Sequence, residues 1–343
     1  MKLEDFNYSL PMDLIAQRPL KQRDKSRLME VSGDEIGHRK FEDIADCFSN
    51  GDILVVNDTK VSPAKLIGKK ESGGIVKILL TKQKSDLIWE CLAQGKKPAN
   101  KKIFFNMRVS SLRGDLPTSR EKFFGIIKNA EENHIAAFSK DIAKYLDKIG
   151  KAPLPAYIKY DAPIKRYNTV YATKPGSIAA PTAGLHFTPR IIKKIKDKRV
   201  LIAPITLHVG LGTFLPVKTE NIESHAMHFE YFSISKETAD IINERKGKLF
   251  VVGTTSIRAL ESAADINGEL KPTTKETNLF IYPGYKWKLK YDGLITNFHM
   301  PKSTLLMLVM AFLSRNRVFE AYNEAIKNQY RFYSFGDAMI ILR

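Results

Sequence analysis

The sequence predicts an α/β protein that carries an inserted β-rich domain. Residues 1–64 mix helix-like and strand-like runs, and strands alternate with helices again from Tyr157 onward. Between these parts, residues 65–151 contain short apolar runs separated by polar turns, with hardly any helical periodicity. We therefore expect a discontinuous α/β domain of residues 1–64 and 152–343, and an inserted basic domain of residues 65–151 that forms a small antiparallel β-barrel.

The elements of the first half follow from local patterns. Phe41–Cys47 is expected to form a short helix, and Gly51–Asp52 turns into the apolar strand Ile53–Val56. Pro153 and Pro155 stop regular structure and so end the insert. The strands expected inside the insert are Val76–Leu80, Leu87–Leu92, Lys102–Phe105, Phe123–Ile127 and His134–Phe138.

The second half alternates between strands and helices. Thr188 caps a helix that Pro189 opens and that continues to about Lys198. The further strands expected are Val200–Leu207, Lys248–Val252 and Leu294–Phe298. The further helices are Lys236–Lys246, Ser256–Ala264, Leu305–Leu313, which Pro301 is expected to open, and Phe319–Asn328.

Composition excludes several classes of protein. Of the 343 residues 43% are hydrophobic and 27% are charged, which is typical of a globular protein. The two cysteines, Cys47 and Cys91, are too few for a disulfide framework, a zinc ribbon or a cysteine-ligated iron–sulfur cluster. No signal-like apolar segment follows the N-terminus, and the apolar run 305–313 is far shorter than the ~20 residues of a membrane span. We expect a cytoplasmic protein without a membrane partner.

The net charge of +18 favours a polyanionic partner. Much of this charge lies in the insert, because residues 65–151 contain 19 basic and 9 acidic residues. Lysine pairs such as Lys96–Lys97 and Lys101–Lys102 lie between its short apolar strands. Nucleic acid is therefore the expected partner, and a compositional bias toward lysine is the alternative.

Two segments combine a histidine with small or amide side chains. Thr182 and His186 lie among small residues, which let a ligand approach the backbone closely. Asn297 and His299 follow an expected strand, and α/β sheets bind ligands at the carboxyl ends of their strands. Tightly packed loops with hydrogen-bonded core histidines fit the same residues.

A third segment begins at His208, which follows an expected strand. Gly210, Gly212 and Thr213 come next, but a third glycine is missing and Pro216 prevents the helix of a dinucleotide-binding loop. A catalytic and a structural role fit His208 equally well.

The string His225-Ala-Met-His228-Phe-Glu230 has a spacing similar to that of metal ligands. It is not the helical His-Glu-x-x-His pattern, which presents two ligands on one face. A hydrogen-bonded polar site for a substrate fits these side chains as well as a metal site does.

The last segment is a turn between an apolar strand and a helix, formed by Gly253, Thr254, Thr255 and Ser256. Free N–H groups and the dipole at a helix start bind anions such as phosphate or carboxylate. Arg258, one turn further on, could add a bidentate clamp. The segment lacks the Gly-Lys-Ser/Thr ending of a nucleotide-binding loop. Plain helix capping with a surface pair between Arg258 and Glu261 is the alternative.

Together these segments resemble one family, the S-adenosylmethionine:tRNA ribosyltransferase-isomerases of queuosine biosynthesis. The resemblance extends from Phe6 to the C-terminus, although Lys60 and Lys65 stand where the family usually has arginine. The strings that carry it are LVVNDT (54–59), YNTVYA (167–172), AAPTAGLHFT (179–188), TLHVGLGTF (206–214), GTTS (253–256), TNFH (296–299) and YRFYSFGD (330–337).

The resemblance implies a barrel-like α/β catalytic domain with an inserted β-barrel, and it implies the reaction. The ribosyl part of S-adenosylmethionine would move to a 7-aminomethyl-7-deazaguanine at the tRNA wobble position, giving epoxyqueuosine-tRNA, adenine and methionine. S-adenosylmethionine would be consumed as a substrate, so neither a cofactor nor a metal is expected. The partners would be this tRNA and S-adenosylmethionine, and we expect a monomer.

Such a reaction needs a base for the acidic C5′ protons, a proton donor for adenine and an anchor for the methionine carboxylate. The candidates for the first two roles are His186, His208, His228, Glu230 and His299. The candidates for substrate binding are Thr182, Gly210, Gly212, Thr213, Gly253, Thr254, Thr255, Ser256, Arg258 and Asn297. The residues alone do not decide which histidine takes which role.

Three other functions remain as alternatives. An S-adenosylmethionine-dependent RNA methyltransferase would be favoured by a complete glycine-rich loop, which the sequence lacks. A non-catalytic RNA-binding protein would leave the histidine and glycine strings unexplained. A metallohydrolase that uses the His225–Glu230 string would contain stoichiometric metal.

Overall fold

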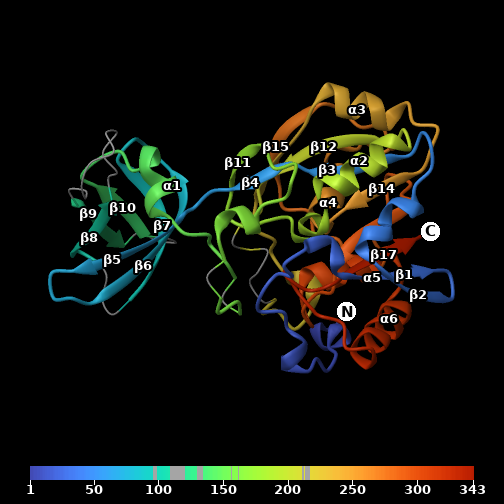
Figure 1. Cartoon of the computed structure of the whole chain (residues 1–343), viewed down its shortest axis with the longest axis horizontal. Helices are drawn as coiled ribbons and strands as arrows, with labels where there is room; N and C mark the ends of the chain where they lie inside the picture. The colour runs from blue at the N-terminus through green and yellow to red at the C-terminus, as the bar shows by residue number, and fades with distance from the viewer. Residues whose placement is uncertain are drawn as a thin grey trace. The chain divides into compact units, whose positions relative to one another are not determined.

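The computed structural model describes residues 1–95, 99–108, 120–129, 134–155, 157–160, 162–210, 212 and 217–343. The chain divides into two compact units, which Figure 1 shows. The larger unit consists of residues 1–60 and 155–343, and the smaller consists of residues 61–154. A mixed sheet with helices forms the first and a closed antiparallel barrel forms the second, so the predicted α/β fold with an inserted β-barrel is confirmed.

The larger unit is built on a nine-stranded sheet with the strand order β15-β13-β12-β3-β14-β16-β17-β1-β2. Strands β12, β3, β14 and β16 run parallel to one another, and β17 is antiparallel to β16. The strands are β1 (Arg27–Ser32), β2 (Glu35–Lys40), β3 (Ile53–Asn57), β12 (Leu201–Leu207), β13 (Glu230–Ile234), β14 (Leu249–Val252), β15 (Thr273–Thr277), β16 (Gly293–Asn297) and β17 (Ala338–Leu342). A separate two-stranded sheet pairs β4 (Thr59–Val61) with β11 (Lys174–Ser177).

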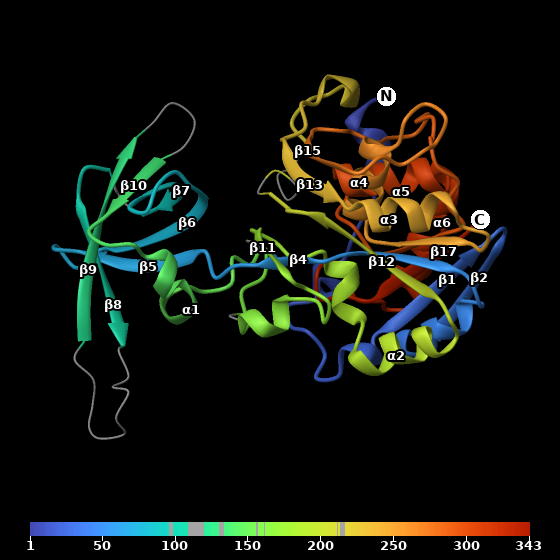
Figure 2. The ribbon, with the colours of Figure 1, turned by 90° about the horizontal axis from the view of Figure 1, so that it is seen from above.

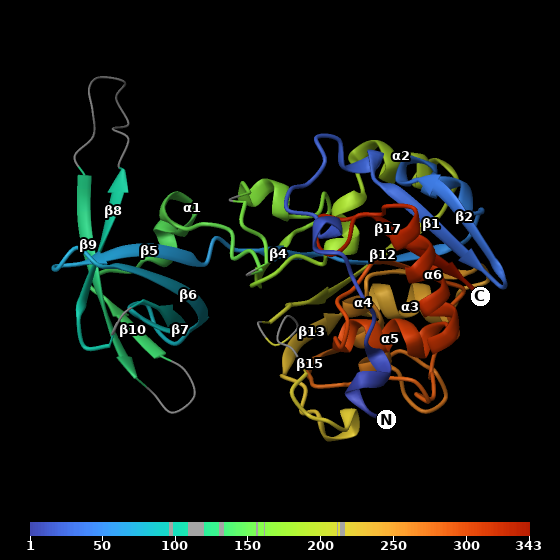
Figure 3. The same ribbon diagram turned by 90° about the horizontal axis from the view of Figure 1, so that it is seen from below.

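Helices cover both faces of this sheet. The α-helices are α2 (Pro189–Asp197), α3 (Lys236–Asn243), α4 (Thr254–Ala263), α5 (Thr304–Phe312) and α6 (Arg315–Lys327). The 3-10 helices are η1 (Leu3–Phe6), η2 (Met12–Leu14), η3 (Arg23–Lys25), η4 (Phe41–Cys47), η6 (Ile164–Tyr167), η7 (Thr182–His186) and η9 (Ile222–Ser224). In Figures 2 and 3, α2 lies on one side of the sheet, and α3 to α6 lie on the other.

The central strand β3 shows why both faces are apolar. Successive side chains of a strand point to opposite faces. Ile53 and Val55 therefore pack in the core that α3 to α6 cover, whereas Leu54 and Val56 pack in the core under α2 and η4. Such double burial produces the continuous apolar run by which the sequence predicted this strand.

The smaller unit is a closed barrel with the strand order β10-β7-β6-β5-β8-β9, in which every pair is antiparallel. Its core includes Leu66, Ile78, Ile103 and Phe138. The strands are β5 (Lys65–Lys70), β6 (Ile75–Gln83), β7 (Ile88–Gln94), β8 (Lys102–Arg108), β9 (Arg120–Asn129) and β10 (His134–Phe138). The short helices η5 (Ala143–Tyr145) and α1 (Leu146–Ile149) follow them.

Some expected boundaries and elements differ from the structure. Helix α5 does not open at Pro301, because Ser303 is its N-cap and its Oγ accepts the N–H of Leu306 at 3.2 Å. Helix α4 begins at Thr254, two residues before the expected start. The local patterns also miss strands such as the edge strand β15, whose sequence Thr-Thr-Lys-Glu-Thr is polar. Pairing with β13 makes this segment a strand, since β-propensity depends on context.

No helix within the described ranges combines the length and the apolar character that a membrane span needs.

Candidate active site

Four parallel strands bring together segments that are distant in the sequence. Because β12, β3, β14 and β16 run in the same direction, their carboxyl ends lie at one edge of the sheet. Asn57 ends β3, and His208 follows β12 at this edge. Gly253 follows β14, and Asn297 ends β16. Open α/β sheets bind their ligands at such an edge.

Two cavities lie beside the end of β16. The larger has a volume of about 390 Å³ and mostly apolar walls, which include Tyr157 and Tyr333. The rings of these two tyrosines lie with their centroids 5.0 Å apart. The second cavity is smaller and is lined by Gly253, Thr254 and Thr255 at the start of α4.

Thr182, Asn297 and His299 line both cavities. Thr182 comes from η7, Asn297 from the end of β16, and His299 from the segment that leads to α5. The structure therefore brings three of the sequence-predicted residues together at the place where the cavities meet. An elongated ligand that occupied both cavities would contact all three.

His299 is the titratable side chain at this junction. Its Nε2 lies 2.8 Å from the Thr296 hydroxyl, and its backbone N–H donates to the Tyr322 hydroxyl at 2.9 Å. Burial lowers the pKa of His299 to about 3, so the imidazole is neutral at pH 7. A neutral imidazole beside a cavity can accept a proton.

His186 is also buried, but it lines neither of these cavities. Its Nε2 lies 3.1 Å from Nδ2 of Asn297, and its Nδ1 lies 2.7 Å from the hydroxyl of Ser26. Asn297 in turn accepts a hydrogen bond from the Thr182 hydroxyl at 2.9 Å. Burial, together with the positive charges of Arg23 and Arg331, lowers the pKa of His186 to about 3.

The start of helix α4 presents backbone donors to the smaller cavity. Gly253 has a φ of 85°, a left-handed conformation that favours glycine. Within the described part of the chain, the N–H groups of Thr254 and Thr255 have no acceptor, as expected for the first turn of a helix. The Thr255 hydroxyl accepts from Asn57 at 3.3 Å. Ser256 is fully buried and donates to the carbonyl of Val252 at 2.7 Å, so its hydroxyl is directed away from the cavity.

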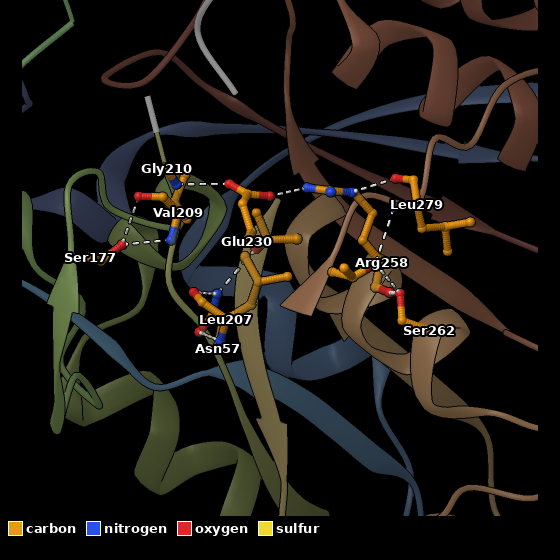
Figure 4. A network of polar contacts seen from close by, with 11 residues as sticks. Asn57, Ser177, Leu207, Val209, Gly210, Glu230, Arg258, Ser262 and Leu279 are labelled. Carbon is orange, nitrogen blue, oxygen red and sulfur yellow. Dashed lines mark hydrogen bonds and ion pairs between the residues drawn. The ribbon is translucent and has the colours of Figure 1, made fainter. Parts of the chain in front are cut away.

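Arg258 and Glu230 form a buried ion pair, which Figure 4 shows. The Arg258 Nη1 donates to one Glu230 oxygen, and its Nε donates to the carbonyl of Leu279 at 2.9 Å. The other Glu230 oxygen accepts the backbone N–H of Gly210 at 2.8 Å. The guanidinium thus faces β13 and Leu279 rather than the start of α4. The alternative surface pair with Glu261 is wrong, because Glu261 is fully buried and accepts from tyrosine hydroxyls and backbone N–H groups.

His208 belongs to a second polar cluster and lines neither of the two cavities. Its Nδ1 lies 2.7 Å from the Thr59 hydroxyl, and its ring stacks on Tyr231 with the centroids 5.5 Å apart. A Cβ at Gly176 would lie only 2.9 Å from the His208 ring, so the glycine permits this packing. Partial burial lowers the pKa of His208, and the charge of Asp58 opposes this shift.

The structure does not gather the His225–Glu230 string into one group. His228 is exposed beside Gly212, His225 packs against the ring of Phe280, and Glu230 is turned toward Arg258. Over the ranges that the structure describes, no three His, Cys, Asp or Glu side chains form a group that could hold a metal ion. Thr213 lies outside the described residues.

Sequence reasoning missed several residues at the site. Tyr157 and Tyr333 line the larger cavity, Thr296 contacts His299, and Ser26 contacts His186. Tyr333 lies in the string 330–337, which already carried the resemblance, so that string was an available signal. Ser26 has no motif around it, because only the tertiary fold places it beside a residue 160 positions away.

The fold and the site together define a class: an α/β protein with an inserted β-barrel and a cavity at the carboxyl ends of its parallel strands. The family model described as "Queuosine biosynthesis protein" matches residues 3–341. The chain therefore belongs to the family of queuosine biosynthesis proteins.

Named relatives agree with this family. A protein of Clostridium kluyveri named S-adenosylmethionine:tRNA ribosyltransferase-isomerase is 47% identical over 350 residues, which cover 99% of this chain and 100% of the relative. A protein of the same name from Acetivibrio thermocellus is 47% identical over 355 residues, with the same coverage. A crystal structure of an S-adenosylmethionine tRNA ribosyltransferase from Thermotoga maritima is 35% identical, with a TM-score of 0.55. That match covers 98% of this chain and 100% of the other.

Proposed function

We propose that this protein is an S-adenosylmethionine:tRNA ribosyltransferase-isomerase. It transfers and isomerises the ribosyl moiety of S-adenosylmethionine onto the 7-aminomethyl-7-deazaguanine at the tRNA wobble position. The products are epoxyqueuosine-tRNA, adenine and methionine. The observation that carries the proposal is the full-length similarity, at 47% identity, to two relatives that bear this name.

The two adjoining cavities suggest how the donor binds. The larger, mostly apolar cavity with Tyr157 and Tyr333 suits the adenosine part. The smaller cavity at the start of α4, of about 40 Å³, suits the carboxylate end of the methionyl part, because the N–H groups of Thr254 and Thr255 favour a carboxylate. The sulfonium and the ribose then lie where the cavities meet, beside Thr182, Asn297 and His299.

In this arrangement His299 is the base for C5′. The positive sulfur acidifies the adjacent C5′ protons, and the neutral imidazole of His299 accepts one of them to leave an ylide. The imidazolium formed in this step then returns the proton to a nitrogen of the departing adenine as the bond between adenine and the ribose breaks. The neutral amine of the tRNA base then attacks the sugar and loses a proton to water. A sugar oxygen displaces the sulfur from C5′, so closure of the epoxide breaks the C5′–S bond and expels methionine as a neutral thioether.

This chemistry needs neither a metal nor a cofactor, since S-adenosylmethionine itself supplies the activated carbon. We further propose that the protein acts in the cytoplasm as a monomer, without a membrane partner. The basic β-barrel supports tRNA binding, because residues 65–151 contain 19 basic and 9 acidic residues.

Mass spectrometry of the wobble nucleoside tests the proposal directly. The protein is incubated with S-adenosylmethionine and tRNA that carries the aminomethyl precursor, and epoxyqueuosine is the expected product. Ribose-labelled donor should transfer its label to tRNA, whereas methyl-labelled donor should not. Transfer of the methyl label alone would instead identify a methyltransferase.

The assignment of His299 has its own test. His299→Gln removes the base and should lower kcat by about 10²- to 10⁴-fold, the usual contribution of a positioned general base. The matched control is His38→Gln, because His38 lies on β2 and contacts Tyr330 rather than either cavity. Full activity of His299→Gln would show that His299 is not the base. It would not contradict the proposed overall reaction.

A further inference from the structure

A continuous chain of side-chain hydrogen bonds leads from the buried Ser26 to the junction of the two cavities. Ser26 contacts Nδ1 of His186, and Nε2 of His186 contacts Nδ2 of Asn297. Oδ1 of Asn297 then accepts from Thr182, which lines both cavities. The three contacts measure 2.7, 3.1 and 2.9 Å, so all are good hydrogen bonds.

The backbone carbonyls of Asp337 and Arg23 determine which atom is the donor in each of these hydrogen bonds. Asn297 Nδ2 lies 3.3 Å from the carbonyl oxygen of Asp337, which can only accept, so the amide atom at this position must be the nitrogen. Its second N–H then donates to Nε2 of His186, and the imidazole proton must be on Nδ1. That proton is donated to Ser26, whose hydroxyl donates to the carbonyl of Arg23 at 3.2 Å.

Both ring nitrogens of His186 are therefore occupied within the protein. The ring is 4% exposed and stacks on Phe41 with the centroids 5.0 Å apart. A histidine held in this way is not placed to take a proton from a substrate. Together with the Asp337 carbonyl, it can instead hold the orientation of the Asn297 amide.

The orientation of Asn297 determines what Thr182 presents to a ligand. The only hydroxyl proton of Thr182 is donated to Oδ1 of Asn297, so the lone pairs of its oxygen remain for the cavity. With Asn297 turned over, its nitrogen would face Thr182, and the hydroxyl proton would be free to point at the ligand. The acceptor Nε2 of His186 and the carbonyl of Asp337 favour the same orientation of Asn297, and this orientation keeps Thr182 an acceptor toward the cavity.

We propose that His186 is a positioning residue that holds Thr182 as a hydrogen-bond acceptor for the α-ammonium group of S-adenosylmethionine. This inference rests on the proposed function. Thr182 lines the smaller cavity together with the first turn of α4, where the methionyl carboxylate is proposed to bind. An ammonium group has donors and no acceptor, so an acceptor-only oxygen matches it and a hydroxyl proton would oppose it.

Calorimetric binding of S-adenosylmethionine and of its analogue without the α-amino group tests the role of Thr182. A charge-assisted hydrogen bond corresponds to roughly 10- to 150-fold in affinity. Thr182→Val should therefore weaken binding of S-adenosylmethionine by about that factor and leave binding of the deaminated analogue nearly unchanged. Thr182→Ser, which retains the hydroxyl, should bind both as the wild type does. An equal loss for both ligands in Thr182→Val would overturn the assignment.

Two variants of His186 test the positioning role. In His186→Gln the side-chain carbonyl can still accept from Asn297, whereas His186→Phe keeps an aromatic ring on Phe41 but offers no acceptor. We expect the Gln variant to retain donor affinity and the wild-type pH profile of kcat. The Phe variant should lose donor affinity, with unchanged affinity for tRNA and a folded circular dichroism spectrum.

Loss of activity in His186→Gln, together with loss of one limb of the pH profile, would make His186 an acid–base group and overturn the inference. The measurements of donor affinity in the Thr182 and His186 variants require no turnover. They therefore still test the inference if the wild type fails to form epoxyqueuosine. A failure of the proposed function is thereby separated from a failure of this inference.

Discussion

Arg258 and Glu230 pair with each other in the interior, where their side chains are only 4% and 2% exposed. Arg258 comes from α4 and Glu230 begins β13, so the pair joins a helix to the strand that packs beside it. Glu230 also accepts the backbone N–H of Gly210, which links the pair to the segment after His208. These two candidate site residues thus connect structural elements to each other rather than line either cavity.

Arg258→Ala should destabilise the protein rather than weaken donor binding. The substitution leaves the carboxylate of Glu230 buried without its partner, which costs about 3–5 kcal/mol of the free energy of unfolding. Urea denaturation measures this loss. The double variant Arg258→Met with Glu230→Leu removes both charges and should recover most of it. A large loss of S-adenosylmethionine affinity at unchanged stability would restore Arg258 as a substrate clamp.

Acid should destabilise the protein through His186 and His299. Both have a pKa of about 3 in the folded state, below the value of about 6.5 for an unfolded chain. As the pH falls from 6.5 toward 3, the unfolded state binds protons that the folded state does not, so the free energy of unfolding decreases. Between pH 7 and pH 5 the expected loss is about 2 kcal/mol for each histidine. Urea midpoints should depend less on pH in His186→Gln and in His299→Gln, and an unchanged dependence in both would contradict the prediction.

Charge removal on the barrel should weaken tRNA binding. Lys101→Ala with Lys102→Ala should lower tRNA affinity and reduce the slope of log affinity against log salt by up to about 1.5, with donor affinity unchanged. Adding substitutions of Lys96 and Lys97, which lie outside the described residues, should extend both effects. The matched control is Lys194→Ala with Lys196→Ala, an exposed pair of lysines on α2. Equal effects of the two double variants would indicate that the positive charge of the barrel reflects a compositional bias toward lysine and not a tRNA-binding surface.

A chelator should leave activity unchanged. Methionine leaves as a neutral thioether and the sulfonium itself acidifies C5′, so no step requires a Lewis acid. Adenine and methionine should be released in a ratio of one each per modified tRNA, measured by chromatography of the reaction. Activity that disappears in a chelator and returns with zinc or iron would refute the metal-free mechanism.

Local sequence patterns were enough to predict the strands that are buried on both faces and the helices that have a clear N-cap. The apolar run of β3 and the Thr188 cap of α2 are examples, since burial and capping leave their signal within a few residues. Strand β15 left no such signal, because hydrogen bonding to β13 rather than its own apolar pattern makes it a strand. The start of α5 was misplaced because a proline is a weaker start signal than a hydroxyl N-cap.

The sequence by itself determined that polar residues follow the strands β12, β14 and β16, and it determined the family resemblance. It could not decide which of these side chains face one cavity. Asn297 meets His186 across 111 positions, and the packing of η7 against β16 sets that contact. Arg258 shows the converse, since the packing of α4 against β13 turns its guanidinium to Glu230 and away from the start of its own helix. Spacing along the chain places a residue on an element, but only tertiary packing sets the direction and the partner of its side chain.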